Sequence, residues 1–408
     1  MTETTTAQAP RPLAYPLERR CPLEPAAEYT RLRAEEPISK VTLPTGRVAW
    51  LVTSHADVRT LLADNRMSSD RSHPDFPQRA PVQQQLRKGF GDLGKALIGL
   101  DLPEHSAPRR MVVNEFTVRR INELRPRIQQ IVDGRIDAML AKGPEVDLVA
   151  ELALPVPSSV ICELLGVPLD RRSFFQERTQ ILLRLSSTPD ERLNAADELR
   201  QFMDGLVTGK EQEPGDDLLG RLIVRNRETG VFTHELLVGM AQVLLIAGHE
   251  TTSNMIALGT IGLLQRPEAV AELQADPELV GRTVEEMLRY YPIIDSLARL
   301  AKEDIEIGEV TIKAGDGVLL SIGSGNRDAA GFADADSFDV HRGARHHVSF
   351  GYGIHQCLGQ NLARMELEVV FSTLLRRIPD LRLAADVDDL PFKDTAGING
   401  VYRLPVTW

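Results

Sequence analysis

The sequence has few cysteines and few aromatic residues. Its 408 residues include three cysteines, Cys21, Cys162 and Cys357, which lie far apart and form no C-x-x-C pair. A disulfide framework is therefore not expected, and this cysteine usage is typical of a reducing cytoplasm.

Long hydrophobic runs, targeting segments and an excess of positive charge are also missing. The longest apolar run, residues 236–248, is interrupted by Gln242 and is too short for a membrane span. The formal net charge of −11 argues against a nucleic-acid partner. No G-x-G-x-x-G opens a strand–turn–helix unit, which argues against a nicotinamide or flavin domain within the chain. We therefore expect a cytoplasmic monomer that binds neither membranes nor nucleic acids.

Helical periodicity dominates what is present. Apolar residues recur at helical spacing in the segments 119–165, 174–185, 195–207 and 233–263. Strand or hairpin patterns are confined to the segments 41–52, 305–322 and 398–401. No flexible linker divides the chain, so we predict a mainly α fold with small β-sheets. Residues 16–408 would form one large domain after a disordered arm, residues 1–15, and the irregular segment 67–100 would be a lid or binding loop.

One cysteine lies in an unusual setting. Phe350, Gly353, Cys357 and Gly359 have the spacing F-x-x-G-x-x-x-C-x-G, and apolar residues then recur at helical spacing. A helix that begins at Cys357 would place N–H groups and a positive dipole next to an anionic sulfur. Gly353 would permit a tight turn, and Gly359 would leave room for a flat group. A lone intracellular cysteine is usually a small buried hydrophobe, but this fixed pattern favours a thiolate ligand.

Polar residues interrupt the long apolar helix at 247–254. In one interpretation, Thr251 and Thr252 bond back to carbonyl groups one turn earlier and bend the helix. In the other, Gly248 opens a groove that Glu250 and Thr251 face as an acid–alcohol proton relay.

Two further pairs have the spacing of neighbours on a helix. His105 and Arg109 share a helix face, either as an anion site or as a solvated basic face. Glu286 and Arg289 form an E-x-x-R pair, which is common on protein surfaces and weak there.

Together, these stretches resemble the cytochrome P450 superfamily from about His55 to Trp408. The haem-binding signature, A-G-x-E-T-T, H-x-x-x-R and E-x-x-R occur in the expected order, although Leu102 stands where most relatives have proline. The resemblance implies a haem b that lies between the long distal helix and the helix after the cysteine. It implies these roles: Cys357 as axial ligand of the iron; His105, Arg109, Arg299 and His355 on the haem propionates; Glu250 and Thr251 in catalysis; Glu286, Arg289 and Arg342 as a structural trio.

The implied activity is hydroxylation of a hydrophobic small molecule by a bacterial monooxygenase of secondary or xenobiotic metabolism. Dioxygen is the co-substrate, and two electrons come from a ferredoxin and its reductase, so that NAD(P)H acts only indirectly. The surface near Arg345, His346 and His347 would receive the donor, or it is an ordinary solvated patch. The expected substrate pocket consists of Val243, Ile246, Ala247, Ile293, Ile294 and Ile398. A haem-thiolate peroxygenase and a non-enzymatic haem sensor are the alternatives, and the substrate itself does not follow from the sequence.

Overall fold

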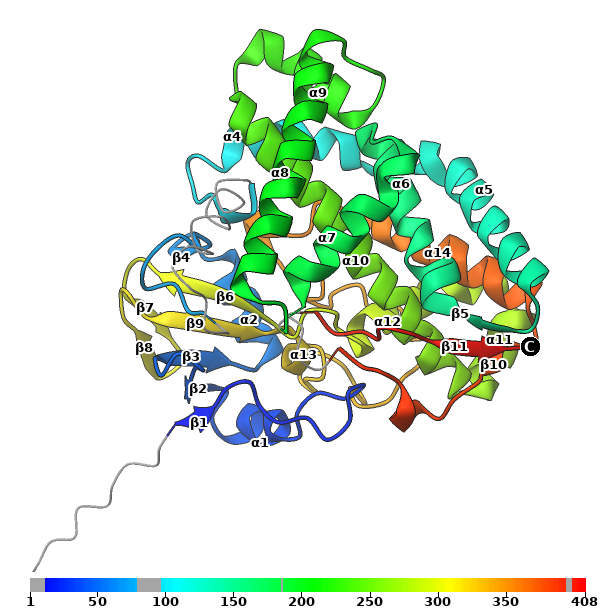
Figure 1. Ribbon diagram of the computed structural model, residues 1–408. Coiled ribbons are helices and arrows are strands. Elements are labelled where there is room, and N and C mark those ends of the chain that lie inside the picture. Colours follow the sequence, from blue (N-terminus) through cyan, green and yellow to red (C-terminus); the bar gives the residue numbers. More distant parts are fainter. Residues whose placement is uncertain (1–11, 79–96, 185, 394–397) are drawn as a thin grey trace, which may run out of the picture.

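The computed structural model describes residues 12–78, 97–184, 186–393 and 398–408, and it confirms the mainly helical prediction (Figure 1). The helices are α1 (Glu28–Glu35), α2 (His55–Ala63), α4 (Ser106–Val113), α5 (Val118–Lys142), α6 (Pro155–Leu165), α7 (Arg172–Leu183), α8 (Pro189–Gln212), α9 (Leu218–Thr229), α10 (His234–Leu264), α11 (Pro267–Ala275), α12 (Val280–Tyr290), α13 (Ile322–Gly325) and α14 (Gln360–Arg377).

The strands form three sheets. They are β1 (Leu13–Ala14), β2 (Ile38–Thr42), β3 (Val48–Val52), β4 (Met67–Ser68), β5 (Glu145–Asp147), β6 (Ser296–Ala301), β7 (Ile305–Ile307), β8 (Val310–Ile312), β9 (Gly317–Ser321), β10 (Arg382–Leu383) and β11 (Pro405–Thr407). One sheet has the order β1-β2-β3-β9-β6-β4, a second has β10-β11-β5, and β7 pairs with β8. In Figure 1 the six-stranded sheet lies on the left, and the β10-β11-β5 sheet lies on the right near the C-terminus.

The largest sheet corrects the prediction for the N-terminal arm. Leu13 pairs with Val41 in parallel β1 and β2, and Tyr15 is buried in a small core cluster. An ordered strand therefore replaces the end of the predicted arm, because Leu13 and Tyr15 can bury their side chains there. Residues 1–11 lie outside the described part, as do residues 79–96 of the predicted lid.

Side-chain oxygens cap the starts of several helices. Ser54 and Thr233 accept the expected backbone N–H bonds at the starts of α2 and α10. Asp216 and Asp217 both precede α9, and Asp217 caps it by accepting from the N–H of Gly220. Two adjacent aspartates satisfy the capping preference equally well, so composition alone could not choose between them.

Helix α10 runs through the middle of the helical part (Figure 1). It packs against α6, α8 and α14, and most of its residues from Leu237 to Leu263 are buried. Its apolar residues belong to the largest core cluster, together with residues of α5, α6, α8, α12 and α14. No helix in the described ranges is both long and apolar enough to cross a membrane.

The predicted trio on α12 forms. Arg289 donates two hydrogen bonds to Glu286, at 2.8 and 2.7 Å, and Arg342 donates a third from Nε at 3.1 Å. The side chains of Glu286 and Arg289 have no exposed surface. Arg289 also donates to the carbonyl groups of Asn326 and Ala335, so it ties α12 to the chain that follows β9.

Candidate active site around Cys357

A tight loop presents Cys357 ahead of α14. The N–H of Cys357 donates to the carbonyl of Phe350 at 2.7 Å, which closes the loop. Gly353 has a φ of +73°, and a Cβ at this position would lie 2.5 Å from the carbonyl oxygen of Leu62, so the predicted tight turn requires glycine. The predicted helix start at Cys357 is wrong, because Leu358 and Gly359 form a turn and α14 begins at Gln360.

The sulfur of Cys357 is accessible although the residue lies deep within the protein. Burial raises the pKa of its thiol above the ordinary value, while a hydrogen bond from the N–H of Gly359 and the charges of Arg109 and Arg364 lower it less. The N–H of Gly359 thus favours the anion as expected for the start of a helix, but burial has the larger effect on the pKa of the thiol. A bound metal cation deprotonates a coordinating thiol outright, so the environment fits a metal ligand better than a free thiolate.

A line of accessible side chains runs along α10. Val243, Ala247 and Thr251 are spaced one turn apart, and they retain accessible surface on a helix that is otherwise mostly buried. Ile246 is half-buried beside them. Three of the residues predicted for the substrate pocket and one of the two predicted catalytic residues therefore share one helix surface.

The polar stretch 247–254 remains helical within α10, and its side chains point to different sides of the helix. Thr251 donates from Oγ1 to the carbonyl of Ala247 at 2.8 Å, as the bending interpretation expects, and its oxygen can still accept. Gly248 opens no groove, because a Cβ there would lie 2.8 Å from the Cδ1 of Ile161 on α6. Its lack of a side chain allows the two helices to approach closely.

Glu250 does not face the accessible side as predicted. Its carboxylate is buried and lies 3.4 Å from both Nδ2 of Asn254 and Nζ of Lys393. Its Oε1 has no hydrogen-bond partner among the described residues, and it lies 4.0 Å from Nε2 of His249. Lys393 was missed because it belongs to no motif and lies 143 residues further along the chain.

The four residues predicted to hold the propionates, His105, Arg109, Arg299 and His355, lie close enough for their charges to act on one another. Burial, together with the nearby charges of Arg299, His105 and Arg109, lowers the pKa of His355 to about 3. Burial also lowers the pKa of Arg299 to about 10. The rings of His105 and His355 are 4.5 Å apart, and Nε2 of each has no hydrogen-bond partner within the described ranges.

These residues fit a haem. The charges of Arg109 and Arg299 and the unpartnered nitrogens of His105 and His355 suit an anion, and the two propionates of haem supply such anions close to a sulfur ligand. A Cβ at Gly359 would meet no described atom within 4 Å, so the surface beside the sulfur is open to a flat group.

Two segments supply the remaining predicted pocket residues. Ile293 and Ile294 follow α12, and Ile398 precedes the C-terminal strand β11. Ile293 is almost fully buried, at 9% exposure, whereas Ile294 and Ile398 are half-buried. Ile293 and Ile398 lie in adjacent segments, because the N–H of Asn399 donates to the carbonyl of Ile293 at 2.8 Å.

An ionic cluster behind the cysteine loop was missed by sequence reasoning. Glu285 on α12 accepts from Arg364 at 2.6 Å and from His347 at 3.1 Å. The guanidinium of Arg364 lies over the ring of Phe350, 4.6 Å from its centroid. Since Arg364 follows Cys357 by two helical turns, its place next to the loop could have been inferred from spacing, but its carboxylate partner could not.

The same cluster corrects the predicted donor surface. His347 is 6% exposed because its ring turns inward to Glu285, so it cannot contribute to a surface patch. Arg345 and His346 are exposed, and His346 stacks on Phe332 with ring centroids 4.4 Å apart.

Glu285 predicts a pH dependence of stability. Burial raises the pKa of its carboxyl, but hydrogen bonds from His347 and Arg364 outweigh burial and lower it to about 2. An unfolded glutamate titrates at about 4.3, so the ion pairs contribute about 3 kcal/mol above that pH and lose it as the pH falls to about 2. Urea unfolding should show Glu285→Gln less stable than the wild type by about this amount at pH 7, with a difference that shrinks in acid.

The control is Asp304→Asn, which removes the exposed pair between Asp304 and Lys313. Solvent screens that pair, so its removal should have a much smaller effect. A Glu285→Gln difference that stayed constant from pH 7 to pH 3 would contradict the assignment.

Comparison with known proteins identifies the family. The family model described as cytochrome P450 matches residues 46–379. The chain is 49% identical over 408 residues to pentalenic acid synthase of Streptomyces avermitilis, and the match covers all of both chains.

Solved structures agree. The chain is 52% identical to cytochrome P450 MoxA of Nonomuraea recticatena, with a TM-score of 0.89 over 97% of this chain and 98% of that one. It is 41% identical to mycinamicin VIII C21 methyl hydroxylase of Micromonospora griseorubida, solved with mycinamicin VIII, with a TM-score of 0.91 over 97% and 100%. The chain therefore belongs to the cytochrome P450 family and is a monooxygenase that hydroxylates small molecules.

Proposed function

We propose that Cys357 binds the haem iron and that His105, Arg109, Arg299 and His355 hold the two propionates of a haem b. The observation that carries this assignment is the group of basic side chains near Cys357, namely the charged Arg109 and Arg299 and the unpartnered Nε2 atoms of His105 and His355. Hydrogen bonds between such cations and carboxylates are strong, so they would fix the plane of the porphyrin.

Bound haem activates dioxygen so that one oxygen atom enters a C–H bond of the substrate and the other leaves as water. The N–H of Gly359 donates to the sulfur of Cys357 and moderates its electron donation. The oxygen of Thr251 accepts a hydrogen bond from a molecule in the accessible interior, since its own proton is given to Ala247. The carboxylate of Glu250 lies on another side of α10, 3.4 Å from both Asn254 and Lys393, so the proton transfer proposed at this surface rests on Thr251.

The substrate that this site supports is a hydrophobic small molecule of secondary metabolism. Val243, Ile246 and Ala247 on α10 and Ile293, Ile294 and Ile398 offer apolar surface around Thr251. The names of two relatives, pentalenic acid synthase and mycinamicin VIII C21 methyl hydroxylase, indicate substrates of this kind for those proteins.

A ferredoxin supplies the electrons in this proposal, and a ferredoxin reductase passes them from NAD(P)H. The exposed side chains of Arg345 and His346 lie on the side of the cysteine loop, where an acidic iron–sulfur protein could dock by complementary charge. Arg345 also lies 3.6 Å from Glu285 of the ionic cluster, and His346 uses its Nε2 in a bond with the carbonyl of Gly331.

Replacement of Thr251 by alanine tests the proposed chemistry. Thr251→Ala should leave substrate binding within about twofold of the wild type, because a hydroxyl on an apolar surface adds little to the affinity. Product formed per electron pair should fall about tenfold or more, with hydrogen peroxide released instead, since a positioned proton-transfer group contributes about 10² or more in rate. Spectral titration, product yield and peroxide release measure these quantities.

Thr260 offers a matched control. It lies on the same helix and makes the same bond to a carbonyl one turn earlier, to Ile256 at 2.7 Å, but it is buried away from the accessible line. Thr260→Ala should retain the wild-type coupling. Equal effects of the two substitutions would mean that both threonines only shape α10, and unchanged coupling in Thr251→Ala would overturn the relay.

A further inference from the structure

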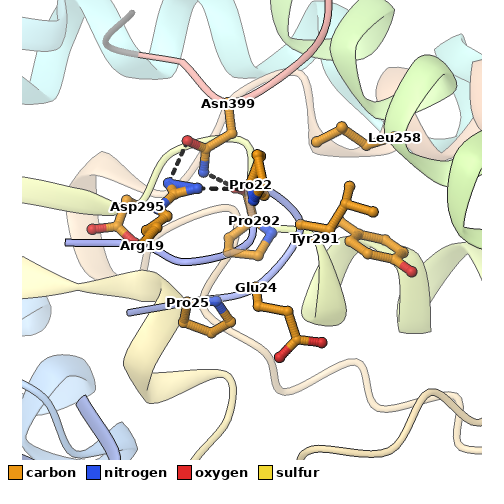
Figure 2. Close-up of a pocket in the computed structure, with 10 residues that line it drawn as sticks. Arg19, Pro22, Glu24, Pro25, Leu258, Tyr291, Pro292, Asp295 and Asn399 are labelled. Carbon is orange, nitrogen blue, oxygen red and sulfur yellow. Dashed lines mark hydrogen bonds between the residues drawn. The ribbon is translucent and has the colours of Figure 1, made fainter. Parts of the chain in front are cut away.

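Arg19 belongs to no motif, yet it joins the two ends of the chain. It lies between β1 and α1, and its Nη2 donates to Oδ1 of Asn399 at 2.5 Å across 380 residues. Its Nη1 donates to the carbonyl of Pro22 at 3.2 Å, which fixes the guanidinium within its own segment. Figure 2 shows Arg19 and Asn399 side by side in a small hollow near Pro292.

Asn399 in turn holds the C-terminal segment on the chain that follows α12. Its Nδ2 donates to the carbonyl of Pro292 at 2.7 Å, and its N–H donates to the carbonyl of Ile293 at 2.8 Å. The side-chain oxygen of Asn399 therefore binds the N-terminal segment at Arg19, and its side-chain nitrogen binds the chain after α12. The neighbouring residues Ile293 and Ile398 are two of those assigned above to the substrate pocket.

The same segment continues to α10. Lys393 pairs with Gly400 through an N–H bond of 2.8 Å, and its Nζ lies 3.4 Å from Glu250. A Cβ at Gly400 would clash with the side-chain oxygen of Asn254, one turn after Glu250. A shift of the C-terminal segment around Asn399 would therefore move both the apolar residues Ile293 and Ile398 and the surroundings of the buried Glu250.

We propose that Arg19 is a positioning residue for substrate selection, which acts through Asn399 to hold Ile293 and Ile398 as one wall. The inference rests on the pocket assignment made under Proposed function. Arg19 touches neither the cysteine loop nor α10 in any described contact, so its effect must pass through Asn399. The bond is charge-assisted, which makes it the strongest of those that fix Asn399.

Hydrogen exchange of the haem-loaded protein tests the mechanical part without any substrate. Arg19→Met should accelerate exchange of the amides in 398–401 by about tenfold, because the loss of one charge-assisted bond changes local opening by about this factor. Amides of α14 should not change. The control is Arg20→Met, which removes the same side chain from the exposed neighbouring position.

Spectral titration with hydrophobic compounds of graded size tests the selection. The ratio of the dissociation constants for a bulky and a small compound should change at least about threefold in Arg19→Met and stay constant in Arg20→Met. In an Asn399→Ser background, Arg19→Met should not change this ratio further, because the effects of two residues that act through one contact are not additive.

The outcomes separate the two proposals. Equal amide exchange of residues 398–401 in Arg19→Met and Arg20→Met would overturn the proposal that Arg19 fixes this segment. Faster exchange in Arg19→Met with an unchanged ratio of dissociation constants would overturn its role in substrate selection. An additive effect in the Asn399→Ser background overturns transmission through Asn399. If the wild type shows no spectral shift with any compound, the pocket assignment fails instead. The exchange result would still show whether Arg19 fixes the segment 398–401.

Discussion

Replacement of Cys357 by histidine is expected to abolish the red-shifted Soret band of the reduced, carbon-monoxide-bound protein. That band arises from thiolate ligation of the iron, and an imidazole nitrogen cannot supply the same electron donation. Hydroxylation should be lost as well, because the sulfur ligand favours cleavage of the O–O bond. Histidine can still bind haem iron, so haem content distinguishes a changed ligand from a lost cofactor.

Cys21→Ser is the matched control for this experiment. Cys21 is a free, half-buried cysteine that lies beside Tyr290 and Tyr291, far along the chain from the cysteine loop. This variant should keep both the band and the activity. Persistence of the red-shifted band in intact Cys357→His protein would falsify the assignment of Cys357 as the ligand.

Arg289→Lys should destabilise the protein severely, by about 3–5 kcal/mol. The guanidinium is fully buried and donates to Glu286 and to three backbone carbonyl groups. Lysine has three donors on a point charge and cannot reproduce the planar fork, so it leaves the buried Glu286 incompletely paired. Since proteins are stable by only about 5–15 kcal/mol, a shift in the urea midpoint and a low yield of folded protein are expected.

The chain contains its own control for this prediction. Glu28 and Arg31 on α1 have the same E-x-x-R spacing, and Arg31 donates to Glu28 at 2.7 and 2.6 Å, but both side chains are exposed. Arg31→Lys should leave the urea midpoint unchanged, because solvent screens an exposed pair. Similar losses for Arg31→Lys and Arg289→Lys would show that spacing matters and burial does not.

These two pairs also show what the sequence could predict. Local features were predictable from neighbouring residues: the caps Ser54 and Thr233, the turn at Gly353 and the length of α10. Periodicity could not tell the buried E-x-x-R pair on α12 from the exposed one on α1, because burial depends on partners far along the chain. Resemblance to the family made that distinction.

The site was less predictable where contacts are distant in sequence. The direction of Glu250 depends on Lys393, and the inward position of His347 depends on Glu285. The sign of the pKa shift at Cys357 depends on depth, which no local pattern reports. Motifs therefore located the residues of the site, whereas their orientation and protonation required the fold.

The line of Val243, Ala247 and Thr251 on α10 has a consequence for how such proteins diverge. The buried surface of the helix fixes its packing on α6, α8 and α14, so substitutions there are constrained by folding. Val243 and Ala247 retain accessible surface, so we expect mutations at these two positions to change stability less than mutations on the buried surface. Gene duplication can therefore be followed by rapid change of the compound that is oxidised, one accessible residue at a time, while the scaffold and its chemistry are inherited intact.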